Sequence, residues 1–142
     1  MDDTKVLPKV GVGALIIRDG KILLGKRLGK HGHGTWAPPG GLVEFNEEIE
    51  TAVERETEEE TGMKAKCGKL YTVTNNIFPN EGKHTITLFY YCEAKGEPKL
   101  TEPDKFEKWD WFEWKKLPSP LFVSVEVLIK KGMDPTKKAS KS

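Results

Sequence analysis

Several features that define other protein classes are scarce in this chain of 142 residues. No apolar stretch approaches the roughly 20 residues that a transmembrane helix needs, so we expect no membrane partner. The N-terminal MDDTKVLPKV is acidic and polar before its first apolar residues, unlike a secretory signal or a transit peptide. Only two cysteines occur, Cys67 and Cys92, which excludes a disulfide framework, and their spacing fits no zinc motif. These absences favour a reduced, cytoplasmic protein.

The chain also lacks a large net charge of either sign, because its 23 basic and 22 acidic residues give a net charge of only +1. This balance argues against nucleic acid or an anionic membrane as a partner, since both attract strongly basic surfaces. What is present is a globular composition, with 37% hydrophobic and 32% charged residues. The length predicts a single domain over residues 1–142, with frayed ends at about 1–7 and 135–142.

The order of apolar runs and turn residues predicts an α/β fold. We expect strands over 10–17, 22–24, 69–76, 85–93 and 108–114, and helices over 46–61 and 121–131. Asn46 is the expected N-cap of the first helix, Gly62 is its expected C-terminal stop, and WAPPGG at 36–41 is a rigid turn. Strands on both sides of a helix, followed by a C-terminal helix, predict an α/β/α sandwich with a central mixed sheet and helices on both faces.

The acidic residues are concentrated in one helix despite the balanced total. Nine of the 22 acids lie between Glu44 and Glu60. Glu56, Glu59 and Glu60 are spaced i, i+3, i+4, so they share one helix face and repel one another near the negative end of the helix dipole. Glu56 and Glu60 also continue the apolar side of the helix, so we expect them to point toward the sheet.

This repulsion indicates that a cation compensates the carboxylates. Arg55 supplies one positive charge, which is not enough to balance the whole group of carboxylates. Mg²⁺ prefers oxygen ligands and tolerates waters and phosphates around it, so it would fit. The alternative is an ordinary acidic helix face in contact with solvent, which is common for runs of charge. Spacing alone leaves both interpretations open.

At fixed positions the chain resembles the Nudix hydrolase superfamily. Eight residues match its pattern G-x5-E-x7-R-E-U-x-E-E-x-G-U, where U is a bulky aliphatic residue: Gly41, Glu47, Arg55, Glu56, Glu59, Glu60, Gly62 and Met63. The flanking segments LLGKR, WAPPGG, TVTNN and EPDKFEKWDW look like those of MutT-like nucleoside-triphosphate diphosphatases. Three positions depart from the family pattern: Thr57 replaces an aliphatic residue, Asn46 a glycine, and Pro38 a leucine or phenylalanine. None of these changes removes a carboxylate.

The resemblance implies a Nudix fold and a hydrolase that requires Mg²⁺, with Mn²⁺ as a substitute. It implies that the metal ligands are Glu56, Glu59, Glu60 and the carbonyl of Gly40, and that the catalytic residues are Glu47, Arg55 and Glu59. In the family pattern, the pair corresponding to Glu47 and Arg55 orients the catalytic carboxylates, and Glu47 is a candidate to help deprotonate water. Glu59 is either a third ligand or the residue that activates water.

Outside this motif, five residues are candidates for substrate binding: Arg27, Phe78, Glu102, Glu107 and Trp109. Arg27 could meet phosphate oxygens, and Glu102 or Glu107 could supply a further metal ligand or base. The aromatic rings could stack on a nucleobase, although strand alternation favours core packing for at least one of Trp109 and Trp111. His31 and His33 lie in GKHGHG, which we interpret as a flexible loop on the substrate side rather than a metal pair.

The expected partner is a small-molecule nucleotide, and the resemblance is compatible with a homodimer. The preferred activity converts a nucleoside triphosphate, including oxidised or non-standard ones, to a monophosphate and pyrophosphate. An ADP-ribose or nucleotide-sugar pyrophosphatase is the alternative within the enzyme class, because Pro79 lies 16 residues beyond the motif. A Nudix-fold nucleotide-binding module without catalysis is the alternative from another class, although such modules typically lose the motif carboxylates.

Overall fold

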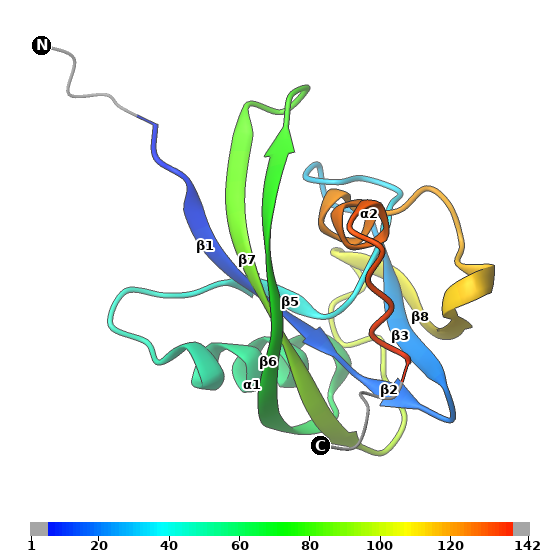
Figure 1. Cartoon of the computed structure of the whole chain (residues 1–142). Helices are drawn as coiled ribbons and strands as arrows, with labels where there is room; N and C mark the ends of the chain where they lie inside the picture. Colours follow the sequence, from blue (N-terminus) through cyan, green and yellow to red (C-terminus); the bar gives the residue numbers. More distant parts are fainter. Residues whose placement is uncertain (1–5, 138–142) are drawn as a thin grey trace, which may run out of the picture.

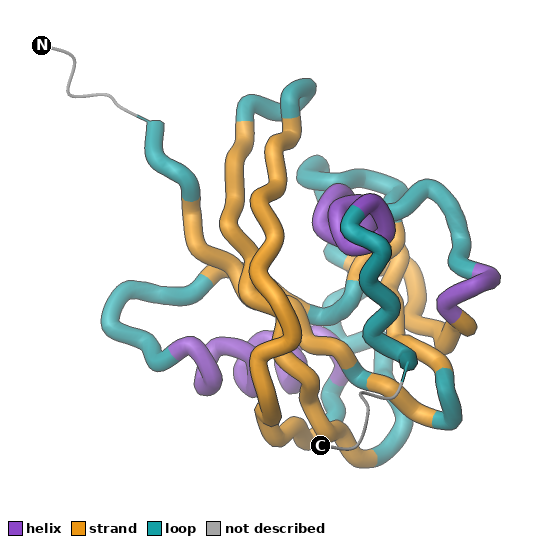
Figure 2. The backbone as a smooth tube through the Cα atoms, in the orientation of Figure 1, coloured by secondary structure: helices purple, strands orange, loops and turns teal. Residues whose placement is uncertain are grey.

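The computed structural model describes residues 6–137, which form two four-stranded sheets (Figures 1 and 2). The first sheet has the order β5 (Gly40–Leu42), β1 (Lys9–Leu15), β7 (Lys83–Lys95) and β6 (Lys64–Phe78). The second has the order β2 (Ile17–Arg18), β3 (Lys21–Arg27) and β4 (Trp36–Ala37), with β8 (Phe106–Glu113) also paired to β3. The first sheet is mixed, because β1 is parallel to β7 whereas β5 and β6 are antiparallel to their neighbours.

One helix covers each face of the first sheet. Helix α1 (Ile49–Thr61) buries Ala52 and Val53 in a core that includes Val12. Helix α2 (Val123–Lys130) buries Leu128 in a second core that includes Phe89. Successive strand residues point to opposite faces, so β1 and β7 contribute to both cores. The predicted α/β class, with a mixed sheet between helices, is confirmed.

The predicted strand over 10–17 is divided between the two sheets. Strand β1 ends at Leu15 and β2 begins at Ile17. Ile16 between them is only 2% exposed, and its carbonyl accepts a hydrogen bond from Leu23 at 3.1 Å. The chain therefore changes sheet at a buried residue, where local sequence gives no turn signal.

The predicted helix start at Asn46 is wrong. Helix α1 begins at Ile49, and Glu48 is its N-cap without a side-chain capping bond. Asn46 has a φ of 66°, in the left-handed region that asparagine tolerates better than most residues. This explains how asparagine can occupy a position where the family pattern has glycine. The predicted stop at Gly62 is confirmed, since its φ is 70° and its N–H donates to Glu58.

The remaining boundaries differ from the predictions by a few residues. Strand β6 is longer than 69–76, β7 is longer than 85–93, β8 is shifted from 108–114, and α2 is shorter than 121–131. The WAPPGG segment contains β4 and β5 on either side of Pro38 and Pro39. The predicted frayed ends lie partly outside the described residues, but Pro135 accepts a hydrogen bond from the Tyr91 hydroxyl at 2.8 Å and is not frayed. Within residues 6–137 no helix is long and apolar enough to cross a membrane.

Candidate active site

Glu56 and Glu60 of α1 lie against β5 of the first sheet, as their position on the apolar side predicts. Glu60 is 7% exposed, and its Oε1 accepts a hydrogen bond from the Gly40 N–H at 3.0 Å. The Glu56 side chain is 14% exposed. Burial raises the pKa of Glu56, and it raises the pKa of Glu60 well above its ordinary value, an effect that the Gly40 N–H opposes. Both groups are therefore costly to ionise without a counter-charge.

The Gly40-Gly41 pair allows α1 to approach the strand this closely. A Cβ atom at Gly41 would collide with the Glu56 carboxylate, and one at Gly40 would collide with the carbonyl oxygen of Val12. Gly40 and Gly41 pair with Gly13 and Val12 of β1. A side chain at Gly40 therefore has no space against the backbone of β1, whereas one at Gly41 would displace the Glu56 carboxylate.

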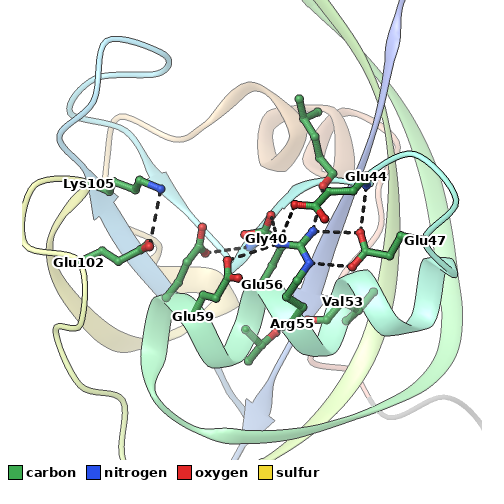
Figure 3. Close-up of polar contacts among 12 residues, drawn as sticks. Gly40, Glu44, Glu47, Val53, Arg55, Glu56, Glu59, Glu102 and Lys105 are labelled. Atoms are coloured by element: carbon green, nitrogen blue, oxygen red, sulfur yellow. Dashed lines mark hydrogen bonds and ion pairs between the residues drawn. The ribbon is translucent and has the colours of Figure 1, made fainter.

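Arg55 links four acidic side chains, Glu44 and Glu47 before α1 and Glu56 and Glu59 on it (Figure 3). Its Nε and Nη2 donate to the two oxygens of Glu47 at 2.6 and 3.0 Å, and its Nη1 donates to Glu56 at 3.2 Å and to Glu59 at 3.3 Å. The hydrogen bond from Arg55 lowers the pKa of Glu47 to about 2. A carboxylate with so low a pKa is a weak base. This low pKa and the two hydrogen bonds to Arg55 favour a positioning role for Glu47 over a role as the base.

The loop before β8 brings a further carboxylate to this end of α1. Oε1 of Glu102 is buried and has no hydrogen-bond partner among the described residues, while Oε2 lies 3.6 Å from Lys105 Nζ. The negative charge of Glu102 contributes to the raised pKa values of Glu56 and Glu60. The Thr101 hydroxyl donates to the Glu59 carbonyl at 2.6 Å and ties this loop to the helix.

A cavity of about 410 Å³ lies beside the buried carboxylates. Its lining includes acids from α1, basic groups from separate elements and three phenylalanines: Glu56, Glu60, Arg27, Lys30, His31, Lys105, Phe89, Phe106 and Phe122. The Arg27 guanidinium lies 4.7 Å from the Phe122 ring centroid, and its Nε donates to the His31 carbonyl at 2.9 Å. The cavity therefore presents opposite charges and aromatic surface to one ligand.

The first sheet contributes two threonines to the lining of this cavity. The fully buried Asn76 donates through Nδ2 to the hydroxyls of Thr85 and Thr87, at 3.2 and 2.9 Å, and both threonines line the cavity. Asn76 Oδ1 and Thr74 Oγ1 are buried without a partner among residues 6–137. Thr85 and Thr87 therefore give this wall of the cavity hydroxyl groups that Asn76 holds in place from behind.

Residues 7–130 match the family model of the NUDIX domain. That match covers most of the chain. The chain belongs to the Nudix hydrolases. Enzymes of this family act on nucleotide-linked substrates and generally use divalent metals.

The named relatives of this Nudix hydrolase differ from one another in activity. It is 35% identical over 115 residues to an ADP-ribose pyrophosphatase of Methanocaldococcus jannaschii, covering 81% of this chain and 68% of the relative. It is also 35% identical over 104 residues to an 8-oxo-dGTP diphosphatase of Proteus vulgaris, covering 72% of this chain and 88% of the relative. A crystal structure of a MutT Nudix hydrolase from Burkholderia pseudomallei has 40% identity and a TM-score of 0.81, over 87% of this chain and 98% of that one.

The donor set of this Nudix hydrolase fits a divalent cation. Among residues 6–137 no three His, Cys, Asp or Glu side chains already converge on one point, and Arg55 lies between the carboxylates instead. However, Glu60 is buried, Glu102 Oε1 lacks a partner, and one guanidinium faces several acids. Carboxylate oxygens are the ligands that Mg²⁺ prefers. These residues therefore suit a hard cation that would complete the charge balance.

The structure brings some of the other predicted residues to the cavity and leaves others away from it. Arg27 lines the cavity, and Phe78 lies behind His31 with ring centroids 4.5 Å apart. Glu107 pairs with Lys26 at 3.7 Å, outside the lining residues. Trp109 packs on Phe106 with centroids 4.5 Å apart and also lies outside the lining, so base stacking by Trp109 is not supported.

Several residues that line the cavity were not among the residues predicted from the sequence. Phe106 and Phe122 were missed because nothing local distinguishes them from core aromatics. His31 was interpreted as part of a flexible loop, but its ring is held by specific contacts. Lys105 had one available signal, its position beside the Glu102 candidate in a segment similar to the family.

Removal of divalent cations is expected to destabilise this Nudix hydrolase more at pH 8 than at pH 5. Without metal, folded Glu60 keeps its proton above the ordinary carboxyl pKa of 4.5, whereas the unfolded chain loses it. The folded state then binds more protons, so stability falls as pH rises from about 4.5 through the raised pKa. A bound cation favours the ionised carboxylates. At a free cation concentration of 100 times its Kd, binding adds about 2.7 kcal/mol to the free energy of unfolding.

Thermal unfolding at both pH values, with Mg²⁺ or with EDTA, measures this difference. The Glu60→Gln variant is the control, because it lacks the ionisable group and should respond weakly to Mg²⁺. Equal melting temperatures with Mg²⁺ and EDTA at pH 8 would contradict cation binding at these carboxylates.

Proposed function

We propose that this Nudix hydrolase cleaves a nucleoside triphosphate, including oxidised or non-standard ones, to the monophosphate and pyrophosphate in the presence of Mg²⁺ or Mn²⁺. The observation that supports it most is the buried Glu60 beside the half-buried Glu56, at the wall of a cavity that Arg27, Lys30 and Lys105 also line. A polyphosphate has enough negative charge to need both a metal at the carboxylates and cations opposite them.

The proposed metal ligands are Glu56, Glu59, Glu60 and the Gly40 carbonyl. When bound, the cation supplies Lewis acidity and offsets charge on the phosphate oxygens. Arg55 holds Glu56 and Glu59 in place through hydrogen bonds, and Glu47 in turn orients Arg55 from the opposite side.

The chain's own residues would bind and orient the rest of the substrate. Arg27 and Lys105 would meet phosphate oxygens that are not held at the carboxylates. The rings of Phe106 and Phe122 offer apolar surface to a nucleobase, and the hydroxyls of Thr85 and Thr87 offer hydrogen bonds to its polar edge. Glu59 and Glu102 are the candidates to accept the proton of the attacking water, because both lie at the end of α1 beside the proposed ligands.

A second candidate function is hydrolysis of ADP-ribose or of a nucleotide sugar. It is favoured by the named activity of the archaeal relative, which shares 35% identity over 81% of this chain. The bacterial 8-oxo-dGTP diphosphatase has equal identity and supports the triphosphate proposal. A binding module without catalysis has less support, because every carboxylate of the motif is present.

A substrate panel with product analysis tests the proposal. We expect 8-oxo-dGTP or another purine triphosphate to be turned over fastest with Mg²⁺, with one pyrophosphate released per monophosphate. Faster release of AMP and ribose 5-phosphate from ADP-ribose would establish the second candidate instead. A raised melting temperature with nucleotide but no product from any compound would indicate the binding module.

A further inference from the structure

The loop over residues 28–35 and the tip of the β6–β7 hairpin meet through His31 and Glu81. Nδ1 of His31 lies 2.6 Å from Oε1 of Glu81, and the Gly32 N–H donates to Oε2 of the same carboxylate at 3.1 Å. One carboxylate therefore holds both the imidazole and the backbone of the next residue. The two partners come from segments 50 residues apart in the chain.

Aromatic contacts fix the orientation of the His31 ring. Its centroid lies 4.5 Å from that of Phe78 and 5.3 Å, edge-on, from that of Phe122. Gly32 has a φ of 65°, and a Cβ there would lie 2.6 Å from the Phe122 ring, so the backbone also fits closely. His31 lines the cavity, and because its Nδ1 is bonded to Glu81, Nε2 is the ring nitrogen left for a ligand.

The surroundings of His31 favour an anionic ligand atom. Arg27, Lys30 and Lys105 line the same cavity as Glu56 and Glu60 of α1. The charged groups that act on His31 are Glu81, which favours the imidazolium, and Arg27 and Lys83, which disfavour it. Burial is the largest effect and lowers the pKa of His31, so the ring in the free protein is mostly neutral above pH 6.5.

We propose that His31 is a substrate-contacting residue, whose Nε2–H donates a hydrogen bond to a phosphate oxygen while Glu81 orients the ring and stabilises its charge. This inference rests on the proposed function, since it requires a phosphate-containing ligand in the cavity. The proton on Nε2 comes from solvent when the nucleotide binds, because the phosphate adds a second negative neighbour. Nucleotide binding therefore takes up a proton, and affinity falls as pH rises.

Two amide substitutions distinguish this role from a purely structural one. Asparagine places its amide near the position of Nδ1 and can still bond to Glu81, whereas glutamine reaches toward the position of Nε2. Loss of a charge-assisted phosphate bond should raise the KM of His31→Asn by about 10- to 100-fold, with kcat changed by less than about threefold. His31→Gln should be affected less. The reverse order, with His31→Asn like wild type, would overturn the proposal.

His33 offers a matched control in the same loop. Its Nδ1 lies 2.6 Å from the Leu28 carbonyl oxygen, and it does not line the cavity. His33→Asn should therefore leave KM and kcat unchanged. An equal rise in KM for both asparagine variants would indicate a general loop effect and would also overturn the proposal.

Calorimetric titration provides a readout that does not depend on turnover. In the Glu60→Gln background, 8-oxo-dGTP and ADP-ribose would be titrated at pH 7.5 in buffers of different ionisation enthalpy. We expect uptake of up to one proton per nucleotide, and no uptake when His31→Gln is added. If His31→Gln leaves the proton uptake unchanged, the inference about His31 is wrong but the proposed function is unaffected. If neither nucleotide binds to the protein with His31 intact, both the inference and the proposed function are wrong. Binding and uptake without hydrolysis by the wild type would support the inference while rejecting the proposed function.

Discussion

Replacement of Glu60 by glutamine is expected to lower kcat/KM on the order of 10³-fold while the protein remains folded. Glutamine has the same shape, and its Oε1 can still accept the hydrogen bond that Gly40 donates at 3.0 Å. What it removes is the negative charge at the most buried carboxylate of α1. Charge stabilisation by a metal supplies several kcal/mol in the transition state, and a loss of about 4 kcal/mol corresponds to this factor.

Steady-state kinetics with the best substrate of the panel measures the effect, and Glu48→Gln is the matched control. Glu48 is the N-cap of the same helix, is exposed, and makes no side-chain capping bond, so its substitution should leave kcat/KM unchanged. Without metal, Glu60→Gln should be at least as stable as the wild type, because no buried carboxylate remains to be ionised there. Activity of Glu60→Gln within threefold of the control would remove Glu60 from the proposed metal site.

Replacement of Gly40 by alanine is expected to reduce the free energy of unfolding by about 3 kcal/mol. The new Cβ would collide with the carbonyl oxygen of Val12 and lie 3.1 Å from the Cα of Gly13. Both atoms belong to the backbone of β1 within the core, so they cannot move aside as a flexible side chain would. Overpacking of this kind costs about 1–3 kcal/mol, and the rigidity of β1 favours the upper end.

Urea unfolding and thermal unfolding measure this loss, which corresponds to a fall in Tm of about 10 °C. Gly29→Ala is the control, because a Cβ there meets no atom within 4 Å, so its stability should change by less than about 0.5 kcal/mol. If the two variants unfolded at the same urea concentration, β5 and β1 could not be as close as the structure has them.

Local sequence predicted the parts of the site that depend on one helix. The i, i+3, i+4 spacing of Glu56, Glu59 and Glu60 is a property of α-helix geometry alone, so their shared face follows directly. The buried placement of Glu60 follows from the apolar side that it continues. The helix start was missed because Asn46 is both a good N-cap and a good left-handed residue, and the sequence does not decide between them.

The parts that were not predicted depend on contacts between distant segments. Phe106 and Phe122 come from β8 and the residue before α2, and only the assembled fold brings them to one cavity with the predicted Arg27. The alternation of side chains along the strand predicted which face of the sheet Trp109 occupies, but it could not predict which residue Trp109 packs against. Its packing follows from pairing opposite Gly25, where the missing side chain leaves room for the indole.

The parallel pairing of β1 with β7 limits when this enzyme can fold during synthesis. Lys9 lies opposite Thr85, and Leu15 lies opposite Tyr91, so the first strand of the chain has its partner far downstream. Such non-local contacts require closure of a long loop before any stabilisation is gained, and they slow folding. A nascent chain that ends at Met63 contains every carboxylate of the Nudix motif, but it does not yet contain β7, the strand with which β1 must pair. Full translation through β7 is therefore a precondition for a formed cavity.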